Sequence, residues 1–185
     1  GETPYLHTAW SWSSDGKDRF MTTYPNENLL TNSSTAQGWN NYAAWTVDDD
    51  KYNGLTVFKR SGQWQGLYQP IKIASSPTTY TWSAWAKEDD YDVQHPSEIF
   101  LYWQAIDKNG NLLANVGQNI GPQVNSVWNR VSFTVPASSI PAGTDSINFQ
   151  LSIGAYDGKY LYVAGIKVES GDTATSWTPA PSEDP

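Results

Sequence analysis

The side chains of this sequence that are best suited to chemistry are aromatic rings set beside amides. The 185 residues include 10 tryptophans and 11 tyrosines, but no cysteine and only two histidines. A core of this size needs few indoles, because each is bulky and its N–H must find a partner. We therefore expect the surplus rings on a surface, where a flat ring packs on the apolar face of a pyranose and amides bond to its hydroxyls. For any single ring, the alternative is packing in the core or at a sheet edge.

Alternation along two segments predicts which rings are exposed. Residues 80–87 and 99–106 each place apolar side chains on one side, so Trp85 and Tyr102 lie on the polar side of their strands. Trp64 lies between two amides and two glycines, in a segment typical of a recognition loop. For the polar members of the set, the alternative is ordinary exposure on a strand. The predicted ligand-binding residues are Trp64, Trp85, Tyr102, Gln104, Arg130, Asn148 and Gln150.

Catalytic chemistry is not predicted, and no catalytic residue is expected. A glycosidase needs two carboxylates that face each other at a set separation. The acidic runs 48–50 and 88–92 instead fall at expected strand ends beside turns. Nucleophilic catalysis would need His7 or His95, and neither lies near a nucleophile-elbow phrase. We therefore expect a binding protein and not an enzyme.

The composition excludes several classes of partner. The net charge is −8, and the 11 lysines and arginines are scattered, so a nucleic-acid partner and an anionic membrane are both disfavoured. No apolar stretch approaches the length of a membrane-spanning helix, and no signal-peptide pattern is present. The lack of cysteine excludes a disulfide framework and a cysteine-ligated metal. Because the chain begins with Gly1, we expect it to be an excised piece of a longer polypeptide.

The element pattern has period 2 almost throughout and is punctuated by glycine and proline, which is typical of a β-sandwich or jelly roll. Trp82 and Trp103 fall on the apolar sides of their strands and are expected in the core, whereas Trp177 is expected to cover an open end of the sandwich. Asn109 and Gly110 form a hairpin turn. The sandwich is expected to open near residues 28–30, and further strands are expected over 55–60, 66–73, 80–87, 99–106, 127–135, 147–153 and 160–168, with Pro70 at an edge or bulge and Gly165 at a bulge.

Residues 1–25 differ from the remainder, because they lack sustained alternation and carry a turn signal at Ser14 to Lys17. We expect an irregular N-terminal lead-in segment or linker over 1–25, a jelly-roll binding module over 26–181, and a C-terminal tail over 182–185.

Short phrases of the sequence resemble a known class of module. The run ESGDTATSWTPAP, residues 169–181, resembles the closing phrase of jelly-roll carbohydrate-binding modules in tail and baseplate proteins of phages that infect Gram-positive bacteria. Residues 28–30 resemble the opening strand of those modules, and residues 80–87 resemble their strand that begins Tyr-x-Leu-Ser-x-Tyr-x-Lys. The segment 9–16, which runs on to Pro25, is similar to lead-in segments of lactococcal and lactobacillar phage baseplate proteins, including distal tail proteins with inserted modules.

The resemblance implies a jelly roll that adheres to cell-wall polysaccharide of the host. By this resemblance the chain would act extracellularly, at the tail tip or baseplate of a virion, and would meet other tail proteins through its parent chain. The resemblance also implies a structural calcium ion, for which Glu27, Glu169 and the 48–50 run offer hard oxygen ligands; no cofactor is expected to be required. Two alternatives stay open: the same class of module on a secreted polysaccharide-degrading enzyme, and a structural baseplate assembly domain whose exposed rings bind a neighbouring protein.

Overall fold

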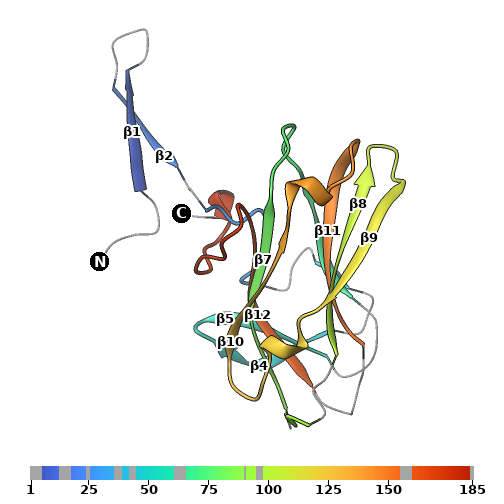
Figure 1. Ribbon diagram of the computed structural model, residues 1–185. Helices are drawn as coiled ribbons and strands as arrows, with labels where there is room; N and C mark the ends of the chain where they lie inside the picture. The colour runs from blue at the N-terminus through green and yellow to red at the C-terminus, as the bar shows by residue number, and fades with distance from the viewer. Residues whose placement is uncertain are drawn as a thin grey trace.

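The computed structural model describes residues 6–12, 18–23, 26–35, 39–41, 45–60, 66–89, 91–94, 98–154 and 160–183. Within these ranges the chain is mostly β-strand, with three 3-10 helices of three residues each. Two antiparallel sheets of five strands lie face to face, and a two-stranded hairpin stands apart from them (Figure 1). The prediction of an all-β jelly-roll sandwich of two antiparallel sheets is confirmed.

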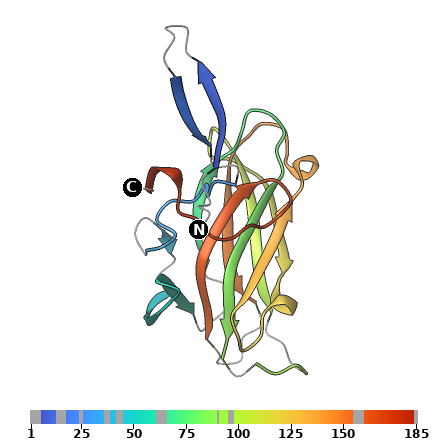
Figure 2. The same ribbon diagram turned by 90° about the vertical axis from the view of Figure 1, so that its left-hand side faces the viewer.

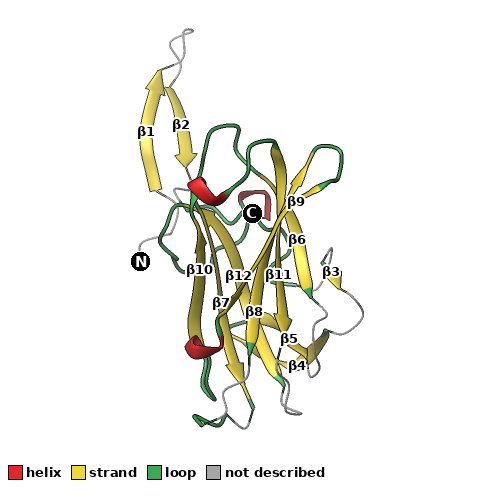
Figure 3. Ribbon diagram, turned by 45° about the vertical axis from the view of Figure 1, so that its right-hand side comes forward, coloured by secondary structure: helices red, strands yellow, loops and turns green. Residues whose placement is uncertain are grey.

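The strands of the first sheet, called sheet I, are β4 (Thr46–Tyr52), β5 (Leu55–Arg60), β7 (Tyr80–Glu88), β10 (Asn129–Val135) and β12 (Leu161–Ser170). Those of the second, sheet II, are β3 (Asn40–Asn41), β6 (Leu67–Lys72), β8 (Ile99–Asp107), β9 (Leu112–Asn119) and β11 (Thr144–Ile153). The hairpin pairs β1 (Leu6–Trp12) with β2 (Asp18–Thr23), and the 3-10 helices are η1 (Gly121–Gln123), η2 (Ala137–Ser139) and η3 (Pro181–Glu183). The strand order is β10-β7-β12-β5-β4 in sheet I and β3-β6-β11-β8-β9 in sheet II. Figure 3 labels these strands.

The core fills the space between the two sheets, which lie beside each other in Figure 1. Trp82 of sheet I and Trp103 of sheet II are 2% and 3% exposed, which confirms both as core residues. Along β8, every second residue from Ile99 to Ala105 is buried and the residues between them are partly exposed. Because successive side chains of a strand point to opposite faces, sheet II has one face in the core and one facing solvent.

The segment after β12 returns over the outer face of sheet I. The ring of Trp177 packs on a small cluster formed by Leu55, Val57 and Ala164. Its indole N–H donates to the hydroxyl of Ser33 at 2.9 Å. Trp177 therefore covers part of a sheet face, and the expectation that it closes an open end of the sandwich is wrong. It shields apolar side chains of β5 and β12 that point away from the main core.

Residues 28–30 lie along β12, although they form no assigned strand. The backbone N–H of Leu29 donates to Val168 O at 2.8 Å. The buried amide of Asn28 donates to Ser33 Oγ, Ile166 O and Thr178 O at 3.0–3.2 Å. The start of the sandwich is thus fixed to its last strand by a backbone hydrogen bond and by the buried side chain of Asn28.

Three edge strands of the two sheets, β3, β4 and β9, were not predicted. The carboxylates Asp48, Asp49 and Asp50 were expected beside a turn, but they lie within β4, at one edge of sheet I. Charged side chains are common on edge strands, where they prevent pairing with another chain. The β9 segment, at an edge of sheet II, is mostly exposed, so its sequence LLANVGQN shows no clear alternation.

The N-terminal segment is more regular than expected. Residues 6–12 and 18–23 pair as antiparallel strands, so the prediction of an irregular segment is wrong for these residues. The pairing register shifts between His7 and Ala9, and this irregularity interrupts the period-2 pattern in the sequence. Figures 1 and 2 show the hairpin standing off from both sheets. The proposed domain boundaries at 25/26 and 181/182 stay predictions.

Candidate functional site

The outer face of sheet II gathers polar and aromatic side chains from neighbouring strands. Tyr68, Gln150 and Tyr102 lie side by side in one row on β6, β11 and β8. In the next row, Asn148 of β11 lies directly opposite Gln104 of β8. Four of the seven predicted ligand-binding residues, Tyr102, Gln104, Asn148 and Gln150, are therefore adjacent on one face.

Two more side chains extend these rows, and the sequence analysis missed both. Asn115 of β9 pairs with Gln104, so its amide lies at the end of the second row. It was missed because β9 was not recognised as a strand. Tyr68 lies on a predicted strand, and alternation from Leu67 and Gln69, which are buried, would have placed it outward. The outer face of sheet II is hereafter defined by Tyr68, Phe100, Tyr102, Gln104, Asn115, Asn148 and Gln150.

The amides of this face have free hydrogen-bonding groups. Within the described part of the chain, the side chains of Gln104, Asn148 and Gln150 form no hydrogen bond to protein, although Asn148 is only 8% exposed. Amides elsewhere are used internally: Gln69 bonds to Thr31, and Gln123 bonds to the backbone of residue 132. Polar groups that are partly removed from water and lack a partner are available to a ligand that supplies one.

The aromatic members stand next to these amides. The rings of Phe100 and Tyr102 stack with centroids 5.8 Å apart and an angle of 29° between their planes. Neither of the two central rows carries a charged residue. The nearest charged pair on β6 and β11, Lys72 and Asp145, lies toward one end of the sheet, with 3.0 Å between Nζ and Oδ2. The face therefore fits an uncharged ligand with hydroxyl groups.

Trp85 and Arg130 lie on the other side of the molecule. They pair with each other between β7 and β10, on the outer face of sheet I. The Arg130 guanidinium donates to Gly165 O at 2.8 Å, Ser83 Oγ at 2.9 Å and Thr175 O at 3.3 Å. Burial lowers the pKa of Arg130 to about 10, and the charge of Glu169 opposes that shift. Its hydrogen-bonding capacity is largely spent on holding the C-terminal segment to sheet I.

The outer face of sheet I carries an aromatic cluster of its own. The rings of Tyr52 and Trp128 stack at 4.4 Å, and Tyr52 meets Trp85 edge-on at 5.5 Å. The ammonium of Lys87 lies 5.3 Å from the Trp128 ring centroid and 5.1 Å from that of Tyr162. Tyr52, Trp128 and Tyr162 all pack on the Leu55, Val57 and Ala164 cluster. Part of the aromatic surplus therefore covers a second apolar cluster.

Trp64, the remaining predicted residue, lies outside the described residues.

The two glutamates expected to hold calcium differ in their surroundings, and the calcium site stays a prediction. Glu27 is exposed, whereas Glu169 is fully buried and its two oxygens accept hydrogen bonds from the Thr175 hydroxyl at 2.7 Å and backbone N–H at 3.1 Å. The Lys167 ammonium donates to Thr175 Oγ1 and Ser176 O, both at 2.9 Å. Burial lowers the pKa of Lys167, and the charge of Glu169 opposes that shift. No group of three or more His, Asp and Glu that could hold a metal occurs in the described ranges.

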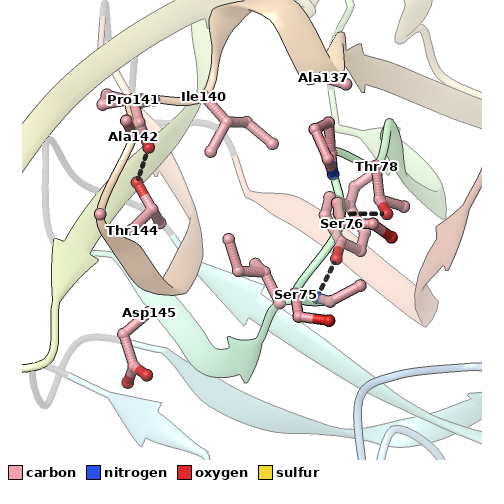
Figure 4. Close-up of a pocket in the computed structure, with 14 residues that line it drawn as sticks. Ser75, Ser76, Thr78, Ala137, Ile140, Pro141, Ala142, Thr144 and Asp145 are labelled. Carbon is pink, nitrogen blue, oxygen red and sulfur yellow. Dashed lines mark hydrogen bonds between the residues drawn. The ribbon is translucent and has the colours of Figure 1, made fainter.

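A pocket of about 480 Å³ opens at one end of the sandwich, between the β6–β7 loop and the loop before β11 (Figure 4). Three hydroxyl groups of its lining have partners: Thr78 donates to Ser76 O at 3.0 Å, Thr144 donates to Pro141 O at 2.7 Å, and Tyr80 accepts from Ala74 N at 2.8 Å.

Comparison with known proteins places the fold among sugar-binding and phage proteins. No family model and no curated relative matches the chain. The structure is similar to Family 16 Carbohydrate Binding Module-2, with a TM-score of 0.55, 20% identity and coverage of 76% of this chain and 99% of that one. It is also similar to the CBM22-1 xylan-binding domain of Paenibacillus barcinonensis Xyn10C, with a TM-score of 0.54, 16% identity, and coverage of 80% and 94%.

A third similar structure is the enzymatically active domain of tailspike protein 4 of bacteriophage CBA120, with a TM-score of 0.57 and 17% identity. The match covers 78% of this chain but only 21% of the tailspike chain, so this chain corresponds to about a fifth of that protein. No helix among the described residues is long and apolar enough to cross a membrane. At these identities the likenesses show the fold, a jelly roll of the type found in carbohydrate-binding modules.

Proposed function

We propose that this chain binds a carbohydrate polymer, without altering it, through the outer face of sheet II. One observation carries the proposal: the unpaired amides of Gln104, Asn148 and Gln150 lie beside Tyr102 on adjacent strands. Planar amides suit the vicinal hydroxyls of a sugar ring, and an aromatic ring suits its apolar face. The likeness in fold to carbohydrate-binding modules supports the proposal.

The same chemistry sets the strength of binding. Each hydrogen bond to a sugar hydroxyl replaces a bond to water and gains only about 0.5–1.5 kcal/mol. Stacking and the release of water should therefore contribute much of the affinity. Single-site affinity is expected to be weak, and display of several copies would supply avidity.

The biological setting is a tail or baseplate protein of a phage, acting outside the cell on the cell-wall polysaccharide of a Gram-positive host. The closing phrase at residues 169–181 and the likeness to a phage tailspike domain support this setting. A module of a secreted polysaccharide-degrading enzyme is equally supported, because the chain is similar in fold to the CBM22-1 xylan-binding domain of Xyn10C. A baseplate assembly domain is the third candidate, and the partly buried aromatic cluster on the outer face of sheet I is the feature that favours it.

Two binding experiments test the proposal. A fluorescent fusion of residues 1–185 is incubated with whole lactobacilli and lactococci, and affinity electrophoresis is run in gels that contain xylan, mixed-linkage β-glucan, mannan or galactan. Binding to cells or to a polysaccharide, reduced in Tyr102→Ala and Gln150→Ala but kept in Gln94→Ala, supports it. Gln94→Ala is the matched control, because Gln94 is an exposed amide in the segment between β7 and β8 and belongs to no strand of sheet II. If the fusion binds none of the cells and none of the polysaccharides, the proposal is contradicted and the assembly function is favoured.

A further inference from the structure

Two residues that lie directly opposite each other, Tyr102 and Gln150, each lie over a glycine. A Cβ added to Gly117 would come within 2.4 Å of Tyr102 Cε1, 2.8 Å of Cδ1 and 3.0 Å of Cζ. A Cβ added to Gly66 would come within 2.1 Å of Gln150 Cγ and 2.2 Å of Nε2. Real Cβ atoms essentially never approach other atoms so closely, so both side chains occupy space that only glycine leaves open.

The Tyr102 ring therefore departs from the usual direction of a strand side chain. Side chains normally stand roughly perpendicular to the sheet. Gly117 is the residue of β9 directly opposite Tyr102, and three ring atoms lie over its backbone. The ring thus reaches across β9, and β9 is the edge strand of sheet II. On its other side the ring is supported by Phe100, at 5.8 Å.

We propose that Gly117 is a positioning residue for ligand binding: by lacking a side chain, it allows the Tyr102 ring to lie across β9 and present its face to a sugar ring. Gly66 has the same role for the amide of Gln150. The two side chains diverge from the centre of their row, so that ring and amide contact different parts of one ligand. This inference rests on the proposed function of the outer face of sheet II.

A purely structural role for Gly117 predicts different results. An aromatic ring over a glycine also shields the glycine backbone and stabilises a sheet edge. In that case Gly117→Ala would lower the melting temperature, and the affinity of the folded protein would be unchanged. If Gly117 positions the ring, Gly117→Ala lowers the affinity and leaves the melting temperature unchanged. The melting temperature is unchanged because β9 is an exposed edge strand that accepts alanine with little cost.

The experiment combines ligand binding with NMR of the whole 185-residue chain. Affinity for xylan, or for whichever polysaccharide of the panel above binds, is measured for wild type, Gly117→Ala, Tyr102→Ala and the double variant. Gln118→Ala is the control, because its side chain lies on β9 but on the opposite face. We expect a loss of about tenfold in each single variant and no further loss in the double variant, since both changes remove the same contact. Gly66→Ala should lower affinity by a similar factor.

The NMR measurement keeps the inference testable if no polysaccharide binds. In the wild type the Hα resonances of Gly117 should be displaced by the ring current of Tyr102, and they should return to ordinary values in Tyr102→Ala. Unchanged Gly117 resonances would overturn the inference whatever the protein binds. Additive losses in the double variant, or a loss in melting temperature without a loss in affinity, would also overturn it. Displaced Gly117 resonances without any binding would refute the proposed function. The ring placement would then stabilise the sheet alone, and the positioning role of Gly117 would be overturned.

Discussion

Some polar side chains of this protein form hydrogen bonds to other protein groups, and others form none to the described residues. Arg130 and Gln104 were both predicted to bind a ligand, and both lie on strands with an apolar opposite side. Arg130 donates to three protein oxygens, whereas Gln104 bonds to none of the described residues. The distinction depends on which segments pack nearby. As a result, Arg130 stabilises the fold, whereas Gln104 is available to bind a ligand.

Replacement of Arg130 should therefore reduce stability. In Arg130→Ala the oxygens of Gly165, Ser83 and Thr175 lose their donor, and the expected cost is about 2 kcal/mol or more, because a buried acceptor without a partner keeps its desolvation penalty. Urea unfolding monitored by tryptophan fluorescence measures the change. The exposed residue Lys108, changed to alanine, serves as the control. An Arg130→Ala variant as stable as wild type would show that the guanidinium does not hold the C-terminal segment.

The turn after β8 should make stability depend on acid pH. The Asp107 carboxylate accepts from the backbone N–H groups of Asn109 and Asn111 and from the Asn111 amide, at 2.8–3.0 Å. The bond from the Asn111 backbone is the main cause of a pKa below the ordinary value of 3.8. A carboxyl with a lowered pKa contributes stability above its unfolded-state pKa and loses it as pH falls through the folded-state value. Urea unfolding at pH 6 and pH 2.5 should thus show a smaller acid loss for Asp107→Asn than for wild type; equal losses would contradict this prediction.

At the scale of elements, local alternation predicted where most strands lie in the sequence, but not which strands pair with one another in a sheet. The strand expected over 55–60 is observed at those residues, and β8 and β11 match their expected ranges to within a few residues. The predicted site placed Trp85 with Tyr102, because period 2 shows which residues share a face of one strand. It does not show which strands share a sheet, since that depends on pairing between residues far apart in the chain. β7 and β8 are consecutive, yet they belong to opposite sheets.

The contacts of the C-terminal segment predict how the removal of metal ions affects the melting temperature. Lys167, Thr175 and Glu169 form a connected buried group beside β12. Since the carboxylate already has a protein cation nearby, neither calcium nor EDTA should change the melting temperature. Thermal unfolding with 5 mM of either reagent, roughly a saturating amount for an extracellular calcium site, makes the comparison. A melting temperature that falls in EDTA and recovers with calcium would restore the calcium site implied by the resemblance.

The whole molecule presents two chemically different faces. The outer face of sheet II is rich in amides and has no charge in its central rows, whereas that of sheet I carries Lys87, Lys59 and a cluster of aromatic rings. Electrostatic attraction should therefore contribute little to saccharide binding, even though the net charge of the chain is −8. Affinity for a neutral polysaccharide should change less than about twofold between 50 and 500 mM NaCl, a range over which exposed charges are progressively screened. A steep loss of affinity with salt would indicate that the charged face of sheet I takes part.

The most direct test of the central claim compares the two faces in one titration series. Calorimetric affinity for the best-binding polysaccharide is measured for wild type, for Tyr102→Ala and Gln150→Ala on sheet II, and for Trp85→Ala and Trp128→Ala on sheet I, with each variant shown to be folded by its circular dichroism spectrum. Our account predicts that the sheet II variants lose affinity by about tenfold and that the sheet I variants bind as wild type does. Loss of binding in the sheet I variants, with the sheet II variants unaffected, would contradict it.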